Sequence, residues 1–256
     1  MLKMELQKNK KIYFSSDNHL GAPNDEESRL REKNFIAWLE HVRKDAQAIY
    51  LLGDLFDFWF EYKTVVPKGF VRVLSKLAEI VDSGIPIVFF VGNHDMWMDD
   101  YFQKELGITV HFKPIELNID KTSFFIGHGD GLGPGDKGYK RMKKLFTNSF
   151  AKTLYRWIHP DLGMRLGKRL SLKNKLISGK EDIKFLGEEK EWLAIYSRRK
   201  LKEKHFDYFI FGHRHLPLEI ELEKNSKYIN LGDWITYFTY GVFDGNSVEL
   251  KTWKNN

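Results

Sequence analysis

Five short apolar runs of the chain each end directly before a polar, glycine-bearing motif. The runs have the length and aliphatic or aromatic content of buried strands, and they occupy residues 11–16, 48–52, 85–91, 123–126 and 208–211. Between the first three, residues 26–44 and 70–81 repeat apolar side chains at helical spacing instead. Strand–helix–strand alternation of this kind predicts a layered α/β sheet.

The helix predicted over residues 26–44 places its apolar residues on one side, which we expect to face the core: Leu30, Phe35, Trp38, Leu39 and Val42. The rest of the pattern predicts strands with few helices between them. These are expected around 108–127 and at 207–211, 217–222, 227–231, 238–243 and 247–253. Two mixed sheets packed face to face, with helices outside, account for the pattern within a single domain, 1–256.

Residues 137–204 interrupt this pattern with a basic, apolar segment. It carries 20 Lys or Arg against 7 Asp or Glu, whereas the rest of the chain carries 21 against 28. Large apolar residues recur in it at helical spacing: Leu145, Phe146, Phe150, Leu154, Trp157, Ile158, Leu162, Leu166, Leu170 and Leu176. Such a segment suits an anionic membrane surface. The alternative is that its apolar residues pack onto the core beneath solvated lysines.

Composition narrows the class of protein further. The chain has no cysteine, so disulfides and thiolate metal sites are excluded and any metal must bind nitrogen and oxygen. The N-terminus is too polar for a signal peptide, and no apolar run reaches the roughly 18 residues of a spanning helix. We therefore expect a cytoplasmic protein. We expect no nucleic-acid partner, because the aliphatic bulk of the basic segment offers little for base stacking.

The five polar motifs supply candidate metal ligands. They read Asp17-Asn18-His19, Gly53-Asp54-Leu55-Phe56-Asp57, Gly92-Asn93-His94-Asp95, Gly127-His128-Gly129-Asp130 and Gly212-His213-Arg214-His215. Each motif alone could be no more than a turn, but side chains at the ends of several strands can converge on one crevice. We therefore predict a centre for two divalent ions, with the ligands Asp17, His19, Asp54, Asn93, His128, His213 and His215.

The chemistry of these motifs favours phosphoryl transfer. Two ions roughly 3.5–4 Å apart stabilise the attacking and leaving oxygens of a phosphoryl displacement. Asp54 is the natural bridge, because one carboxylate can give an oxygen to both ions. The glycines at 53, 92, 127 and 212 each fit a tight turn where a side chain would crowd the site. Four histidines lie outside the motifs and are expected to be structural or surface residues: His41, His111, His159 and His205.

The motifs resemble the pattern of the calcineurin-like metallophosphoesterase superfamily: D-x-H, G-D-x-x-D, G-N-H-D/E, G-H and G-H-x-H. The match extends over nearly the whole chain. It implies an α/β fold, a four-layer αββα sandwich, around a dinuclear centre of Mn²⁺, Fe or Zn²⁺, of which we expect Mn²⁺. It further implies that Asp17, His19 and His215 complete the coordination of one ion, and that Asn93, His128 and His213 complete the coordination of the other. His94 would be a general acid or transition-state stabiliser, oriented by Asp57.

Within that superfamily the chain is similar to the UDP-2,3-diacylglucosamine hydrolases of lipid A synthesis. The likeness rests on residues 16–21, on residues 53–59, and on His128-Gly129-Asp130 followed by Asp136 and Tyr139. It implies a helical lid over about 137–187, with Asp136 and Tyr139 holding the glucosamine phosphate. The implied reaction cleaves the pyrophosphate of UDP-2,3-diacylglucosamine to UMP and 2,3-diacylglucosamine 1-phosphate. The implied location is peripheral on the inner membrane.

His94 departs from that family, whose well-studied hydrolases carry Arg at this position. A pyrophosphate expels a phosphate monoester, which needs no proton. An alkyl phosphoester expels an alkoxide, which benefits roughly 10²–10⁴-fold from a general acid. His94 therefore leaves open a phosphomonoesterase or phosphodiesterase acting on a smaller soluble phosphoester. Ser171, Asn174 and Lys175 resemble a substrate-binding cluster of the family's lid in type but not in spacing.

A third hypothesis is a non-catalytic interaction module that keeps the fold and docks a partner on its basic face. The complete set of metal-ligating residue types disfavours it, because a scaffold needs no such set.

Overall fold

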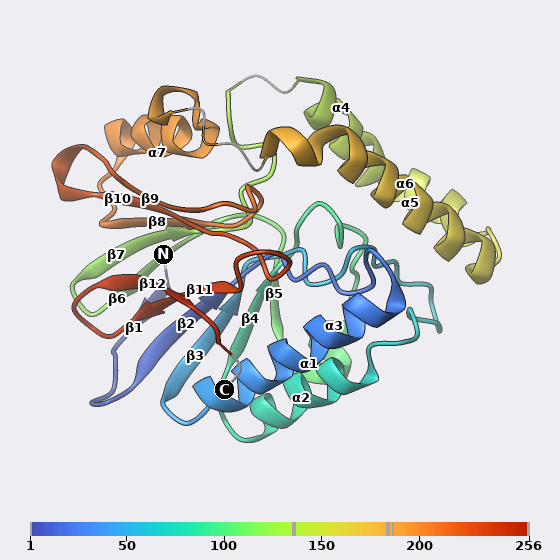
Figure 1. The fold of residues 1–256 in the computed structure, drawn as a ribbon, viewed down its shortest axis with the longest axis horizontal. Coiled ribbons are helices and arrows are strands. Elements are labelled where there is room, and N and C mark those ends of the chain that lie inside the picture. The colour runs from blue at the N-terminus through green and yellow to red at the C-terminus, as the bar shows by residue number, and fades with distance from the viewer. Residues whose placement is uncertain (1, 135–136, 183–184, 186, 255–256) are drawn as a thin grey trace.

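Figure 1 shows the computed structural model, which describes residues 2–134, 137–182, 185 and 187–254. Two six-stranded sheets lie face to face, and helices cover their outer sides. The first sheet contains four parallel neighbours, β2 (Lys11–Ser15), β3 (Ala46–Leu51), β4 (Ile87–Phe90) and β5 (Thr109–His111). The antiparallel strands β11 (Thr239–Phe243) and β12 (Val248–Thr252) complete it on the β2 side.

Three helices lie against the outer face of this sheet: α1 (Asp25–Val42), α2 (Val71–Asp82) and α3 (Tyr101–Leu106). Of the residues predicted to line the inner side of α1, Phe35, Trp38, Leu39 and Val42 are fully buried. The prediction is wrong for Leu30, which is 57% exposed. Arg31 occupies the buried position in its place, because its guanidinium donates hydrogen bonds to the carbonyl oxygens of the loop that follows β2.

The second sheet has the order β1 (Leu2–Met4), β6 (Ile115–Ile119), β7 (Thr122–Ile126), β8 (Tyr208–Phe211), β10 (Lys227–Leu231) and β9 (Pro217–Glu221). Its outer face is covered by α7 (Trp192–Glu203), and short 3₁₀ turns occupy Glu188–Lys190 and Glu223–Asn225. Apolar residues of both sheets form the core between them. The predicted class, an α/β sandwich of two mixed sheets flanked by helices, is confirmed.

Between β7 and α7 the described residues form three helices, α4 (Lys137–Phe146), α5 (Ser149–Arg156) and α6 (Pro160–Asp182), before the 3₁₀ turn at Glu188–Lys190. They extend beyond the sandwich at one end of the molecule, at the right of Figure 1. Most of their large apolar side chains do not pack onto the core, since 44–82% of each is exposed at Leu145, Phe150, Leu154, Trp157, Leu162, Leu166 and Leu170. Leu176 lies outside the residues whose side chains are described. No helix of the described ranges is both long and apolar enough to cross a membrane.

Candidate metal centre

The predicted ligands lie where the strands of both sheets end. Asp17 and His19 follow β2, Asp54 follows β3, and His215 follows β8. One ligand atom from each of these four residues lies within 4.8 Å of all the others. Nε2 of His19 and Nε2 of His215 are 3.0 Å apart, and Oδ1 of Asp17 is 3.3 Å from Nε2 of His215. Residues separated by almost 200 positions of sequence thus form one compact group of donors.

Asp54 lies between this group and a second set of predicted ligands. Its Oδ2 is 3.7 Å from Nε2 of His19 and 3.4 Å from Nε2 of His128. On the far side, Nε2 of His128 is 3.1 Å from Oδ1 of Asn93. The ring of His213 lies beside that of His128, with centroids 5.2 Å apart. The Asp54 carboxylate therefore lies between the two groups of candidate ligands.

Two carboxylate oxygens of the site are buried and accept no hydrogen bond from the described residues, namely Oδ1 of Asp17 and Oδ2 of Asp54. An unpaired carboxylate oxygen away from water is costly, and buried charges are normally paired or coordinate a metal. Both atoms point at imidazole nitrogens that can also serve as ligands. The donor set therefore fits divalent cations that accept carboxylate, amide and imidazole together.

The electrostatics of the site favour positive charge at these nitrogens. Burial opposes charge on each buried group, but His215 and His19 hold the pKa of Asp17 well below its usual range. Burial also lowers the pKa of His128, yet Asp54 outweighs it and raises that pKa to about 10. Asp17 likewise overcomes burial and raises the pKa of His215 to about 9. A divalent cation competes with protons for the same nitrogens and is stabilised by the same carboxylates.

Groups behind the ligands fix their orientation. Nδ1 of His128 lies 2.7 Å from the carbonyl oxygen of Leu52, to which it can donate, so that Nε2 is left for the centre. Nδ1 of His215 lies 3.6 Å from Oδ2 of Asp233. The backbone N–H of His213 donates to Oδ2 of Asp17 at 2.9 Å. Asp233 belongs to none of the five motifs, and only its position in space associates it with the site.

The backbone at the site is strained. Five of the predicted ligands have positive φ angles of 46–68°, namely Asp17, His19, Asp54, His213 and His215. Residues other than glycine rarely adopt this region, and such strain concentrates at functional sites where the surrounding structure imposes it. Here the ends of the buried strands impose it, and the chain reverses sharply enough to aim successive side chains at one point.

Three of the four predicted glycines are required by close contacts within the site. A Cβ at Gly53 would collide with the ring of His128 and the backbone of Gly92. A Cβ at Gly92 would collide with the Asp54 carboxylate, and one at Gly212 would collide with Ser16 and Asp17. Gly127 is also predicted to be required because a side chain would crowd the site, and this reason is wrong. A Cβ there would meet the ring of Pro114, which is not part of the site. That glycine serves the packing of a loop.

His94 and Asp57, predicted to act in catalysis, lie side by side at the margin of the centre. Nδ1 of His94 is 2.9 Å from the carbonyl oxygen of Asp57 and 3.8 Å from its Oδ1. The rings of His94 and His19 meet edge to face with centroids 4.7 Å apart. A third side chain, Ser171 of α6, bonds to both His94 and Asp57. The sequence associated Ser171 only with a substrate-binding cluster of the family, and it gave no indication of this contact, because α6 is remote from both motifs along the chain.

The two predicted substrate-binding residues differ in what the structure shows. The Tyr139 hydroxyl bonds to the carboxylate of Asp130, and its ring centroid is 6.4 Å from that of His213. Tyr139 therefore lies beside the centre. Asp136 lies outside the described residues.

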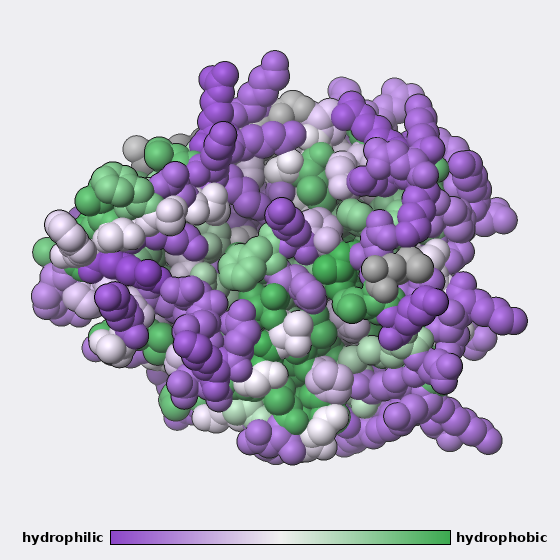
Figure 2. Space-filling model, turned by 180° about the vertical axis from the view of Figure 1, so that it is seen from behind, coloured by the Kyte–Doolittle hydropathy of each residue, from purple (hydrophilic) through white to green (hydrophobic). Residues whose placement is uncertain are grey.

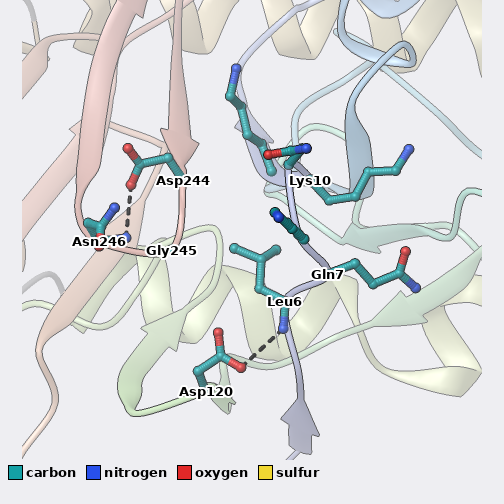
Figure 3. Close-up of a pocket in the computed structure, with 10 residues that line it drawn as sticks. Leu6, Gln7, Lys10, Asp120, Asp244, Gly245 and Asn246 are labelled. Atoms are coloured by element: carbon teal, nitrogen blue, oxygen red, sulfur yellow. Dashed lines mark hydrogen bonds between the residues drawn. The ribbon is translucent and has the colours of Figure 1, made fainter.

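Of two cavities in the described part of the chain, only the smaller adjoins the site. One of about 490 Å³ lies at the opposite end of β2 from the ligands, beside Asp120 and Asp244, and these carboxylates already accept backbone N–H groups (Figure 3). A smaller cavity of about 200 Å³ adjoins the centre. Asp57 and Phe58 line it from the sandwich, and Lys168 lines it from α6. Substrate beside the centre would therefore meet α6.

A family model and curated relatives agree with this geometry. Residues 10–217 match the family model described as calcineurin-like phosphoesterase. The chain is 41% identical to a UDP-2,3-diacylglucosamine hydrolase of Porphyromonas gingivalis, over 94% of this chain and 97% of that one. It is 28% identical to a UDP-2,3-diacylglucosamine hydrolase of Shewanella piezotolerans, over 93% and 95%. A solved dimetal phosphatase from Danio rerio shares 12% identity, with 96% of each chain covered and a TM-score of 0.48. The chain belongs to the calcineurin-like phosphoesterase family, and it is a hydrolase.

Proposed function

We propose that the protein cleaves the pyrophosphate of UDP-2,3-diacylglucosamine, releasing UMP and 2,3-diacylglucosamine 1-phosphate. The observation that carries this proposal is the 41% identity to a hydrolase of that name, spanning 97% of its length. The site supports it, because the ligand side chains converge on a buried, acidic and imidazole-rich centre. A metal site of this kind suits a substrate that is attacked at phosphorus.

Two divalent cations would be held by the predicted ligands, with Asp54 between them. Mn²⁺ is the ion we expect, and Fe or Zn²⁺ suits the same donors. When bound, the ions would supply an ionised water as the nucleophile and neutralise charge on the phosphoryl oxygens. The protein contributes rigid placement, because buried strand ends and left-handed backbones fix the ligand side chains.

His94 acts on the substrate in this proposal, and Asp57 orients it. The Nδ1 side of the His94 ring contacts the Asp57 carbonyl oxygen, so Nε2 is the nitrogen available to substrate oxygens. An imidazole there can donate a hydrogen bond or a proton to the oxygens of the phosphoryl group. Tyr139, beside His213, and Asp136 would hold the sugar phosphate.

The helical segment, about 137–187, would act as a lid over the acyl chains within a single domain, 1–256. Exposed apolar residues support this, because Phe150 of α5 is 70% exposed, Trp157 directly after α5 is 82% exposed, and Leu162 of α6 is 58% exposed. In Figure 2 the α5–α6 end lies at the left, where green side chains stand among purple ones. Exposed basic residues of α6, such as Arg165 and Arg169, suit anionic head groups. These features support the proposal that the protein is cytoplasmic and peripheral on the inner membrane.

The test of the reaction is UMP release from UDP-2,3-diacylglucosamine in detergent with Mn²⁺. We expect turnover by the wild type, none by Asp54→Asn, and unchanged turnover by Asp161→Asn, a matched change at an exposed position of α6. A His94→Arg protein, which introduces the residue of the family's well-studied hydrolases, should retain the activity. An absence of UMP release by a folded, metal-loaded protein would overturn the proposal.

His94 itself favours a second candidate, a phosphomonoesterase or phosphodiesterase with a smaller soluble substrate. An imidazole can protonate an alkoxide leaving group, which an arginine does poorly at neutral pH. Metal-dependent turnover of an alkyl phosphodiester, together with failure to cleave the lipid substrate, would favour this candidate.

The membrane proposal has its own experiment, sedimentation with vesicles that contain phosphatidylglycerol. Phe150→Ala/Trp157→Ala should lower partitioning by about tenfold or more, since two large apolar side chains no longer enter the interface. Val71→Ala is the matched control, because Val71 is 67% exposed on α2. Equal partitioning of all three proteins would exclude Phe150 and Trp157 as the membrane contact.

A further inference from the structure

Small residues pack one side of α6 closely against the sandwich, and this contact is the seat of α6. Gly163, Gly167 and Ser171 follow one another at intervals of four and are buried, whereas the residue before each is an exposed leucine. A Cβ at Gly167 would collide with the ring of Phe58, and one at Gly163 with the hydroxyl of Tyr62. The helix therefore lies directly against aromatic side chains of the loop that also carries Asp54 and Asp57.

Ser171 ends this buried side and reaches the margin of the metal centre. Its Oγ is 2.8 Å from Oδ2 of Asp57, 2.9 Å from the Asp57 carbonyl oxygen and 2.9 Å from Nδ1 of His94. An ionised carboxylate only accepts hydrogen bonds, so the hydroxyl donates to Asp57 and can accept from the N–H of His94. Ser171 is 8% exposed, so water has little access to these bonds.

The three groups come from three separate parts of the fold. Asp57 follows β3, His94 follows β4, and Ser171 lies 77 residues beyond His94 on α6. The hydroxyl joins the first two and fixes the rotation of the imidazole, with the proton on Nδ1. A group behind a catalytic ring acts in this way by holding the ring in its productive orientation.

We propose that Ser171 is a positioning residue that couples the seating of α6 to the orientation of His94 and Asp57. The proposal rests on the hydrolase function proposed above. It gives α6 a second role besides covering the substrate, because a displaced α6 releases the imidazole on which the reaction depends. A substrate that holds α6 in its seat thereby orders the residue that acts on its own phosphoryl group.

A double-mutant cycle tests the coupling with UDP-2,3-diacylglucosamine. Ser171→Ala should lower kcat by about tenfold or more with little change in KM, as expected when a hydrogen bond to a charged group is lost. In a His94→Ala protein the same Ser171→Ala change should cost less than about twofold, because the residue through which it acts is gone. Equal losses in both backgrounds, or a change confined to KM, would overturn the proposal and place Ser171 on the substrate.

A second measurement needs neither substrate nor turnover. In the full-length chain, labelled with ¹⁵N-histidine and freed of paramagnetic ions, the Nδ1–H signal of His94 is identified by its loss in His94→Ala. Its hydrogen exchange should become about fivefold faster or more in Ser171→Ala, since one of its acceptors is removed. Unchanged exchange would show that Ser171 does not hold His94. Altered exchange in a protein without UDP-2,3-diacylglucosamine hydrolysis would instead support the coupling and refute the substrate.

Discussion

The Asp233 carboxylate lies 3.6 Å from Nδ1 of His215, while Nε2 of the same ring faces Asp17 at 3.3 Å. A carboxylate behind a ligating imidazole orients the ring and strengthens its donor nitrogen, commonly by 10–100-fold in metal affinity. Oδ1 of Asp233 also accepts backbone N–H groups from the turn after it, such as that of Thr236. One carboxylate thus holds a loop and a candidate ligand together.

Asp233→Asn should weaken metal binding by about 10–100-fold. The amide keeps an oxygen for the turn, so the fold should survive while the negative charge behind His215 is lost. Competition with a fluorescent chelator measures the affinity, and Asp161→Asn is the control. An unchanged affinity would mean that Asp233 serves the turn alone.

His94→Ala should distinguish substrates by their leaving groups. Loss of a general acid should slow an alkyl phosphodiester by roughly 10²–10⁴-fold. Cleavage of UDP-2,3-diacylglucosamine should suffer less, because its leaving phosphate monoester needs no proton. Steady-state kcat values for the two substrates measure the difference. The same loss on both would show that His94 stabilises the phosphoryl oxygens and does not protonate the leaving group.

Removal of metal should lower the thermal stability of the wild type. A ligand present at 100 times its Kd stabilises the native state by about 2.7 kcal/mol, which corresponds to a Tm shift of about 5–10 °C for a chain of this size. Asp54→Asn should lose this shift, because Asp54 is the carboxylate between both ligand groups. Calorimetry with and without chelator measures it. A chelator-sensitive Tm in Asp54→Asn would contradict the bridging position.

Gly167→Ala should destabilise the seat of α6, although alanine is the better helix former. The added methyl collides with Phe58, and crowding of this kind costs about 1–3 kcal/mol. We expect kcat to fall as in Ser171→Ala. Gly138→Ala in α4 is the matched control, since no atom lies within 4 Å of its added methyl. Denaturant titration and kcat measure the two effects, and equal behaviour of the two variants would refute the close seat.

The sequence predicted the positions where strands end, because buried strands leave apolar runs and each run stops at a polar motif. The predicted strand at 227–231 matches β10, and the predicted helix at 70–81 differs from α2 by one residue at each end. The ligand groups follow from this, since the ends of neighbouring strands meet. The ligands' division between two ions stays a prediction, as does the substrate role of Asp136.

What the sequence did not predict depends on contacts between distant segments. The contacts of Ser171 with Asp57 and of Asp233 with His215 exist only because α6 and the loop after β10 lie beside the centre. Leu30 is exposed and Arg31 is buried, because the guanidinium of Arg31 donates hydrogen bonds to carbonyl oxygens of the loop after β2. The short elements β1 and α3 have too few residues for a periodic pattern to show.

The left-handed backbones of Asp17, His19, Asp54, His213 and His215 bear on how ligand deletions should be designed. Asparagine, aspartate and histidine tolerate that conformation better than most residues. Alanine does not, because it has a Cβ but no polar side chain to stabilise the left-handed backbone by a local hydrogen bond. An alanine at any of the five would remove a metal-ligating atom and would also favour a different backbone conformation. Loss of activity in such a variant would therefore combine a chemical effect with a conformational one. Asparagine for the aspartates, and asparagine or glycine for the histidines, removes the donor or its charge while the loop keeps its path.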